Sequence, residues 1–199
     1  LISLLVIPVY IVQAQKDARP LPNGDDATLI RRRYIVVFDE VARSGELYYP
    51  RDGSNHMFWW EWAVRYNGET HWASEFDVIK HRSGRRMAYW VLSNGDVKVK
   101  IRIVARDPRT IYVKYYIYPL KRDIGNIIFY QGADFDIDGT MDYDTAFYER
   151  RTVYAVGEEG TYIGFRSINK RPIGWHVDDY SDMWDAIGEG RLNNANYYY

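Results

Sequence analysis

The sequence predicts an all-β protein, built as a large antiparallel β-sandwich of two sheets. Hydrophobic and polar residues alternate with a period of two in several segments, as they do in strands with one buried face. Turn signals that contain glycine or proline separate these segments at short intervals. The composition includes 19 Tyr and 7 Trp among 199 residues, and aromatic residues favour strands. No long amphipathic helix pattern interrupts the series, which favours a sandwich.

The alternation is clearest in three segments. In 58–66, Trp60 shares one face with other apolar residues, while Glu61 lies on the opposite face. The same pattern recurs in 97–103 and in 111–117. Further strands are predicted at 34–38, 46–49, 69–80, 86–92, 126–130, 152–156 and 161–167.

The turn signals fall between these segments. Asn67-Gly68 and Asn94-Gly95 are the strongest, because both central positions of a type I′ hairpin turn need positive φ. The others are Asp52-Gly53, Ser83-Gly84, Asp107-Pro108 and Glu159-Gly160. One short helix is predicted near 179–188, around Met183, Trp184 and Ile187.

Charge and cysteine content exclude several classes of function. The chain has 26 basic and 27 acidic residues and a formal net charge of −1, which argues against a non-specific nucleic-acid binder. It has no cysteine. Disulfide scaffolds, thiolate zinc sites, iron–sulfur clusters and cysteine nucleophiles are therefore excluded.

The apolar residues 1–12 have three interpretations. They are too few to span a bilayer as a helix, but they have the length of a signal-peptide core, and Val12-Gln13-Ala14 offers small residues for cleavage after Ala14. The signal-peptide interpretation of 1–14 predicts a secreted, extracellular protein with no membrane span. The same residues can instead form a buried strand or short helix at the domain edge. A third interpretation is an apolar tail that a neighbouring subunit accepts as a donated strand.

The rest of the chain is predicted to contain one domain. Residues 15–29, with Pro20, Pro22 and Asn23-Gly24, have the composition of a linker. The β-sandwich domain is assigned to 30–195, and 196–199 are the start of a further linker or a tail.

An acidic loop is the sharpest chemical signal. Its spacing matches the first half of a calcium-binding loop, with Gly139 at the sharp turn. The candidate ligands of Ca²⁺ are Asp134, Asp136, Asp138, Thr140 and Asp142. The match ends at the twelfth position of the loop, where Thr145 stands in place of the Glu that binds the ion through both oxygens. Two other interpretations fit the same residues. The loop can be a solvated or hydrogen-bonded turn, or it can contain a catalytic carboxylate pair.

Other chemical signals are weak. The four histidines have no metal-ligand spacing, and neither a Gly-x-Ser-x-Gly motif nor a phosphate-binding loop is present. No catalytic residue is therefore assigned. Trp59, Trp72 and Trp175 are candidates for stacking on sugar rings, although packing in an aromatic core is the favoured explanation for such residues.

Several motifs, taken in order, resemble one enzyme family. The segments concerned are 46–50 (Glu-Leu-Tyr-Tyr-Pro, followed by Asp52), 107–109 between two strands, 144–148, 161–165 and 184–192. Together they resemble the N-terminal domain of glucodextranases and prokaryotic glucoamylases, which are members of glycoside hydrolase family 15. The resemblance covers roughly residues 30–195.

The resemblance implies a large two-sheet supersandwich, also described as galactose-mutarotase-like. In that family the sandwich precedes and supports a helical barrel that carries two catalytic Glu residues, and the whole enzyme releases glucose from α-glucans. The barrel is absent from this chain, so no catalytic residue is carried over. This chain alone is expected to be non-catalytic, and its partner would be a C-terminal helical domain of the same polypeptide.

Two other functions fit the same sequence. One is a stand-alone extracellular structural protein, such as a filament or surface-layer subunit that self-assembles by strand donation. The other is a carbohydrate-binding module that uses the candidate tryptophans on an α-glucan.

Overall fold

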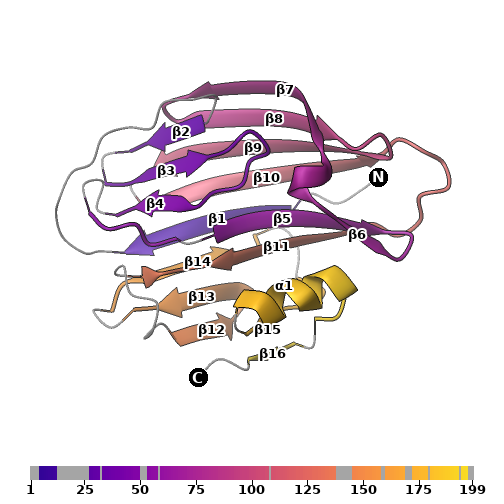
Figure 1. The fold of residues 1–199 in the computed structure, drawn as a ribbon. Helices are drawn as coiled ribbons and strands as arrows, with labels where there is room; N and C mark the ends of the chain where they lie inside the picture. Colours follow the sequence, from indigo (N-terminus) through magenta and orange to yellow (C-terminus); the bar gives the residue numbers. More distant parts are fainter. Residues whose placement is uncertain are drawn as a thin grey trace.

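The strands form four sheets, the largest of which has eight strands (Figure 1). The computed structural model describes residues 5–12, 27–31, 33–49, 53–57, 59–107, 109–137, 145–157, 160–168, 172–178, 180–192 and 194–196. The strands are β1 (Leu5–Val12), β2 (Ala27–Ile30), β3 (Ile35–Phe38), β4 (Glu46–Tyr48), β5 (Trp59–Tyr66), β6 (Glu69–Trp72), β7 (Asp77–Gly84), β8 (Met87–Ser93), β9 (Val97–Asp107), β10 (Thr110–Pro119), β11 (Ile128–Asp134), β12 (Thr145–Glu149), β13 (Thr152–Val156), β14 (Tyr162–Arg166), β15 (His176–Val177) and β16 (Ala195–Asn196). One 3₁₀ turn, η1 (Ala73–Glu75), and one helix, α1 (Tyr180–Glu189), complete the described elements.

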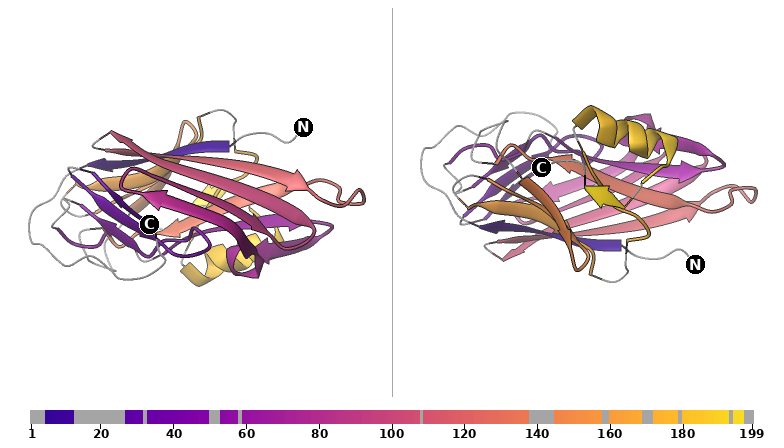
Figure 2. Two further views of the ribbon diagram at one scale, coloured as in Figure 1. Left: turned by 90° about the horizontal axis from the view of Figure 1, so that it is seen from above. Right: turned by 90° about the horizontal axis from the view of Figure 1, so that it is seen from below.

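The predicted all-β sandwich is confirmed. The eight-stranded sheet has the order β12-β13-β14-β1-β10-β9-β8-β7. The opposing layer consists of two three-stranded sheets, β11-β5-β6 and β2-β3-β4. Apart from the short parallel pair β15–β16, the strand pairs are antiparallel. Figure 2 shows the two layers and the helix α1 on the outside.

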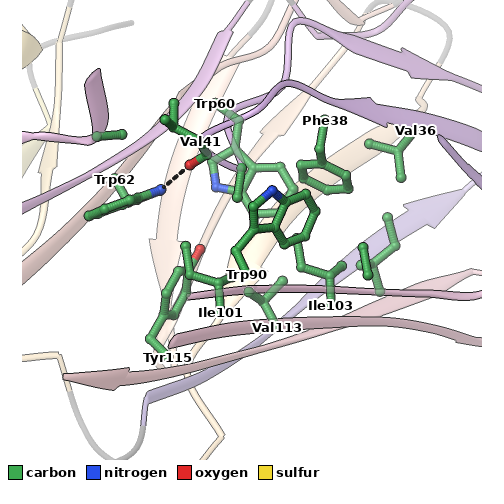
Figure 3. Packing of buried hydrophobic residues seen from close by; sticks show 14 of the residues in the cluster. Val36, Phe38, Val41, Trp60, Trp62, Trp90, Ile101, Ile103, Val113 and Tyr115 are labelled. Carbon is green, nitrogen blue, oxygen red and sulfur yellow. Dashed lines mark hydrogen bonds between the residues drawn. The ribbon is translucent and has the colours of Figure 1, made fainter. Parts of the chain in front are cut away.

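An aromatic core lies between the two layers. Phe38 of β3 makes edge contacts with Trp60 of β5 and with Trp90 of β8, at ring-centroid distances of 4.9 and 5.9 Å. Trp62 is fully buried, and its indole N–H donates to the Val41 carbonyl over 2.9 Å (Figure 3). The buried indoles hold the layers together because each brings a large apolar area and a specific packing geometry.

The segment predicted as one strand over 69–80 is divided in the structure. β6 ends at Trp72, the 3₁₀ turn η1 follows, and β7 begins at Asp77 in a different sheet. The Glu75 carboxylate accepts a hydrogen bond from the Trp72 backbone N–H over 2.8 Å. That bond stabilises the turn, a local effect that the period-two pattern does not encode.

The N-terminal apolar residues form the strand β1 in the large sheet. β1 pairs with β10 along Leu5–Tyr10 and with β14 along Val9–Val12. This is the strand of the second interpretation, and it lies inside the sheet rather than at the domain edge. Signal-peptide cleavage after Ala14 remains a prediction. β2 falls in the range assigned to a linker, 15–29, and extends the sandwich to Ala27.

The predicted helix is confirmed at Tyr180–Glu189. It ends where Gly190 adopts a φ of 72°, with the Gly190 N–H bonded to the Ile187 carbonyl and the Arg191 N–H bonded to the Ala186 carbonyl. This is the Schellman arrangement, in which glycine supplies the left-handed residue that stops a helix.

Candidate functional site

The outer face of the β11-β5-β6 sheet is divided into two halves. α1 covers one half, where Trp184 and Ile187 pack over Ala63 and Tyr130. Gly132 makes this approach possible, because a Cβ at that position would lie 2.8 Å from the Trp184 ring. The other half, at the Trp59 end of β5, carries polar side chains.

Trp59, Glu61 and Asp134 lie together on this second half. The β5–β11 register places Asp134 directly opposite Trp59 and Gly132 opposite Glu61, so all these residues share one face. The Trp59 indole N–H donates to Glu61 Oε2 over 2.9 Å. The sequence predicts Asp134 as a calcium ligand and Trp59 as a sugar-stacking residue, and the fold places the two side by side.

A tight loop after β3 adds Asp39 and Arg43 to the site. Asp39 Oδ1 accepts hydrogen bonds from the backbone N–H groups of Val41 and Arg43, and Asp39 Oδ2 bonds to the Arg43 guanidinium over 2.7 Å. The Arg43 guanidinium also lies 3.8 Å from Glu61 Oε1 and 5.2 Å from the centre of the Trp59 ring. We call Asp39, Arg43, Trp59, Glu61 and Asp134 the carboxylate–tryptophan cluster.

Burial raises the pKa of two carboxyl groups in this cluster, Glu61 and Asp134. It raises the pKa of Glu61, against the opposing effects of the Trp59 hydrogen bond and the Arg43 charge. It also raises the pKa of Asp134 to about 6, with a smaller contribution from the nearby charge of Asp136. Each carboxyl group is thus more readily protonated than an exposed one, and a protonated carboxyl both donates and accepts hydrogen bonds.

The Asp134→Asn variant is expected to be more stable than the wild type at pH 7. The folded state raises the pKa of Asp134 from its ordinary 3.8 to about 6, so the folded protein binds this proton more tightly and loses stability as the pH rises from about 4 to about 6. Asn carries no charge and avoids this loss. After allowance for the partial exposure of Asp134 to water, the free energy of unfolding of the variant is expected to exceed that of the wild type by about 1 kcal/mol at pH 7. Thermal unfolding at pH 4 and pH 7 measures the difference. Asp185→Asn, on the exposed side of α1, is the control, and an equal change in both variants would contradict the argument.

The predicted calcium ligands are only partly placed. Asp134 ends β11 and Asp136 follows it, both half-buried, whereas Asp138, Thr140 and Asp142 lie outside the described residues. Within the described ranges, no group of three or more His, Asp or Glu residues could hold a metal ion. The calcium site therefore stays a prediction.

The three candidate sugar-stacking tryptophans lie apart. Trp72 packs edge-on against Trp184 under α1 at 5.4 Å, and Trp175 stacks on Tyr148 at 4.6 Å. Only Trp59 belongs to the carboxylate–tryptophan cluster. Arg43 and Glu61 were not among the sequence candidates, because Arg43 reaches the site from a loop and Glu61 has the pattern of an ordinary outward strand residue.

Comparison with known proteins gives no relative. No family model, curated protein or solved structure matches the chain. In the part of the chain that the structure describes, no helix is long and apolar enough to cross a membrane.

Proposed function

We propose that this chain is a non-catalytic, carbohydrate-binding β-sandwich domain of a secreted α-glucan hydrolase. The observation that carries the proposal is the carboxylate–tryptophan cluster at the Trp59 end of the β11-β5-β6 sheet. The catalytic helical domain implied by the sequence resemblance is its proposed partner.

The side-chain chemistry of the cluster suits a sugar. An indole offers a flat apolar surface to the C–H groups of a sugar ring, and its polar edge is fixed here by Glu61. Asp134, directly across from Trp59, is a hydrogen-bonding group for sugar hydroxyls. Sites of this kind place a few polar groups around an apolar contact surface.

The contacts of Glu61 favour binding rather than catalysis. Its side chain lies between the Trp59 N–H and the Arg43 guanidinium, and only 8% of the residue is exposed. A general acid needs access to the leaving-group oxygen. We therefore assign Glu61 a positioning role for Trp59 and expect this chain to release no glucose from soluble starch.

Titration with maltoheptaose tests the proposal. The wild-type chain is expected to show saturable binding by calorimetry, and Trp59→Ala is expected to weaken it about tenfold or more, because the loss removes the stacking surface. Trp175→Ala is the matched control and should bind like the wild type, because that ring already stacks on Tyr148. A flat wild-type titration, or an equal loss in both variants, would overturn the proposal. Circular dichroism confirms that each variant is folded.

The position of β1 favours a second candidate, a structural subunit that assembles by strand donation. β1 is the first described strand, yet it lies between β10 and β14, which come much later in the chain. Without β1, β10 and β14 would each have an edge with unpaired backbone N–H and C=O groups. A β1 segment from another copy of the chain can form the same hydrogen bonds with these edges.

Cysteine cross-linking distinguishes an internal β1 from a donated one. Ile7 is the register partner of Val113 on β10, and the chain has no cysteine of its own. In the Ile7→Cys/Val113→Cys variant, a donated strand gives oligomer ladders on a non-reducing gel, whereas an internal strand gives a cross-linked monomer. A secreted product that begins after Ala14 would contradict both an internal and a donated β1, and it would support the signal-peptide interpretation. The single variants serve as controls.

A further inference from the structure

The solvent-facing side of the large sheet carries a concentrated set of basic side chains. On β9, Lys98, Lys100 and Arg102 alternate with fully buried core residues. The β9–β10 register places Lys114 directly beside Arg102 and Tyr116 beside Lys100. We define the basic face as the outward residues Lys98, Lys100, Arg102, Arg106 and Lys114, with Tyr89, Tyr112, Tyr116 and Tyr118 between them.

We propose that the basic face binds a linear anionic polysaccharide, one that carries carboxylate or sulfate groups. The face belongs to the opposite layer from the carboxylate–tryptophan cluster and does not depend on it. The inference therefore goes beyond the proposed function of that cluster.

The basic face holds like charges close together. Among the described residues, none of its five basic side chains forms an ion pair. Lys114 and Arg102 are like charges directly opposite each other on neighbouring strands, a pairing that destabilises a sheet. The whole chain is nearly neutral, with a net charge of −1, so this concentration of positive charge is local. An anionic partner relieves the repulsion.

The arrangement suits an extended polymer rather than a single small anion. Outward residues two apart on a strand are about 7 Å apart, and neighbouring strands are about 5 Å apart. Lys98, Lys100, Arg102 and Lys114 therefore form a flat array of positive charge. A chain with regularly repeated anionic groups contacts several of these side chains at once, and multiple contacts add avidity.

The tyrosines and the near-neutral charge of the whole chain favour a polysaccharide over a nucleic acid. The ammonium groups of Lys98 and Lys100 lie 5.5 and 5.0 Å from the centre of the Tyr118 ring, and the Arg106 guanidinium lies 5.7 Å from that of Tyr112. Domains that bind nucleic acids usually carry an overall basic excess, whereas this chain has a net charge of −1. Tyrosine hydroxyls and cations together match the hydroxyl and acid groups of an anionic sugar chain.

The test uses the chain of residues 1–199 and measures its affinity for defined probes. The probes are a heparin hexasaccharide, a polygalacturonate hexamer, neutral maltoheptaose and a 20-nucleotide oligo(dT). We expect the wild type to bind at least one of the two anionic oligosaccharides, and the one preferred identifies sulfate or carboxylate as the recognised group. The affinity should fall as salt is added, because exposed charges are screened.

Charge reversal locates the site. Lys100→Glu/Arg102→Glu should weaken anionic oligosaccharide binding about tenfold or more. Arg122→Glu/Arg191→Glu makes the same change in net charge at exposed positions that are not part of the basic face and should leave binding within about twofold. An equal loss in both double variants, no wild-type binding to either anionic oligosaccharide, or tighter binding to oligo(dT) would overturn the proposal. Maltoheptaose binding reports on the carboxylate–tryptophan cluster, so the two proposals can fail separately.

Discussion

Replacing Trp62 with Ala is expected to lower the free energy of unfolding by about 4 kcal/mol. Trp62 is fully buried and packs edge-on against Phe76 at 5.0 Å and in stacked geometry against Phe129 at 6.3 Å. Its removal leaves a cavity and takes the N–H donor from the Val41 carbonyl. Urea unfolding followed by far-ultraviolet circular dichroism measures the loss.

The variant Trp62→Phe separates packing from hydrogen bonding. Phe retains an aromatic ring in the same place but cannot donate to Val41, so the expected loss is about 1–2 kcal/mol. A loss below about 1 kcal/mol in the Ala variant would mean that the indole is not part of a closely packed core.

The second large effect is expected at Gly164, where β14 meets β13. A Cβ at Gly164 would lie 2.4 Å from both the Tyr154 Cβ and the Val153 carbonyl oxygen, far inside normal contact distance. Because one of these atoms belongs to the backbone, the two strands must move apart. Gly164→Ala is therefore expected to cost about 3 kcal/mol and to increase amide hydrogen exchange in β13 and β14.

Gly160 provides the matched control in the turn that precedes β14. It has a φ of 78°, and nothing lies within 4 Å of a Cβ built there. Gly160→Ala therefore adds only backbone strain, about 1 kcal/mol. If both substitutions cost the same, the close approach of β13 and β14 would not be a determinant of stability.

Local patterns were sufficient to predict most of the longer regular elements, although β2, β12, β15 and β16 were not predicted. Alternation identified β5, β9 and β10, and clustered apolar residues near Trp184 identified α1. The prediction was wrong at 69–80, because the chain leaves one sheet at Trp72, turns at Ala73–Glu75 and enters another sheet at Asp77. Within this turn Glu75 accepts a hydrogen bond from the Trp72 backbone N–H, a local contact that a period-two pattern does not encode.

The candidate site was predicted only in part. Trp59 and Asp134 are visible as residues with useful chemistry, but their pairing depends on the β5–β11 register, and Arg43 depends on a loop closed by Asp39. The basic face could be anticipated from the alternating Lys and Arg residues on β9. That none of its basic side chains forms an ion pair with another described residue depends on which strands become neighbours in the assembled sheet.

The place of β1 also determines the order in which the sheet can form. Leu5 pairs with Tyr115 and Ile11 with Ile163, so β1 leaves the ribosome long before either of its partner strands has been made. Contacts this far apart in sequence slow folding, because a long loop must close before they form. Until then β10 and β14 present open edges, which are prone to aggregation. From this arrangement we expect completion of the large sheet to be a late folding step, during which β1 must be kept from pairing elsewhere.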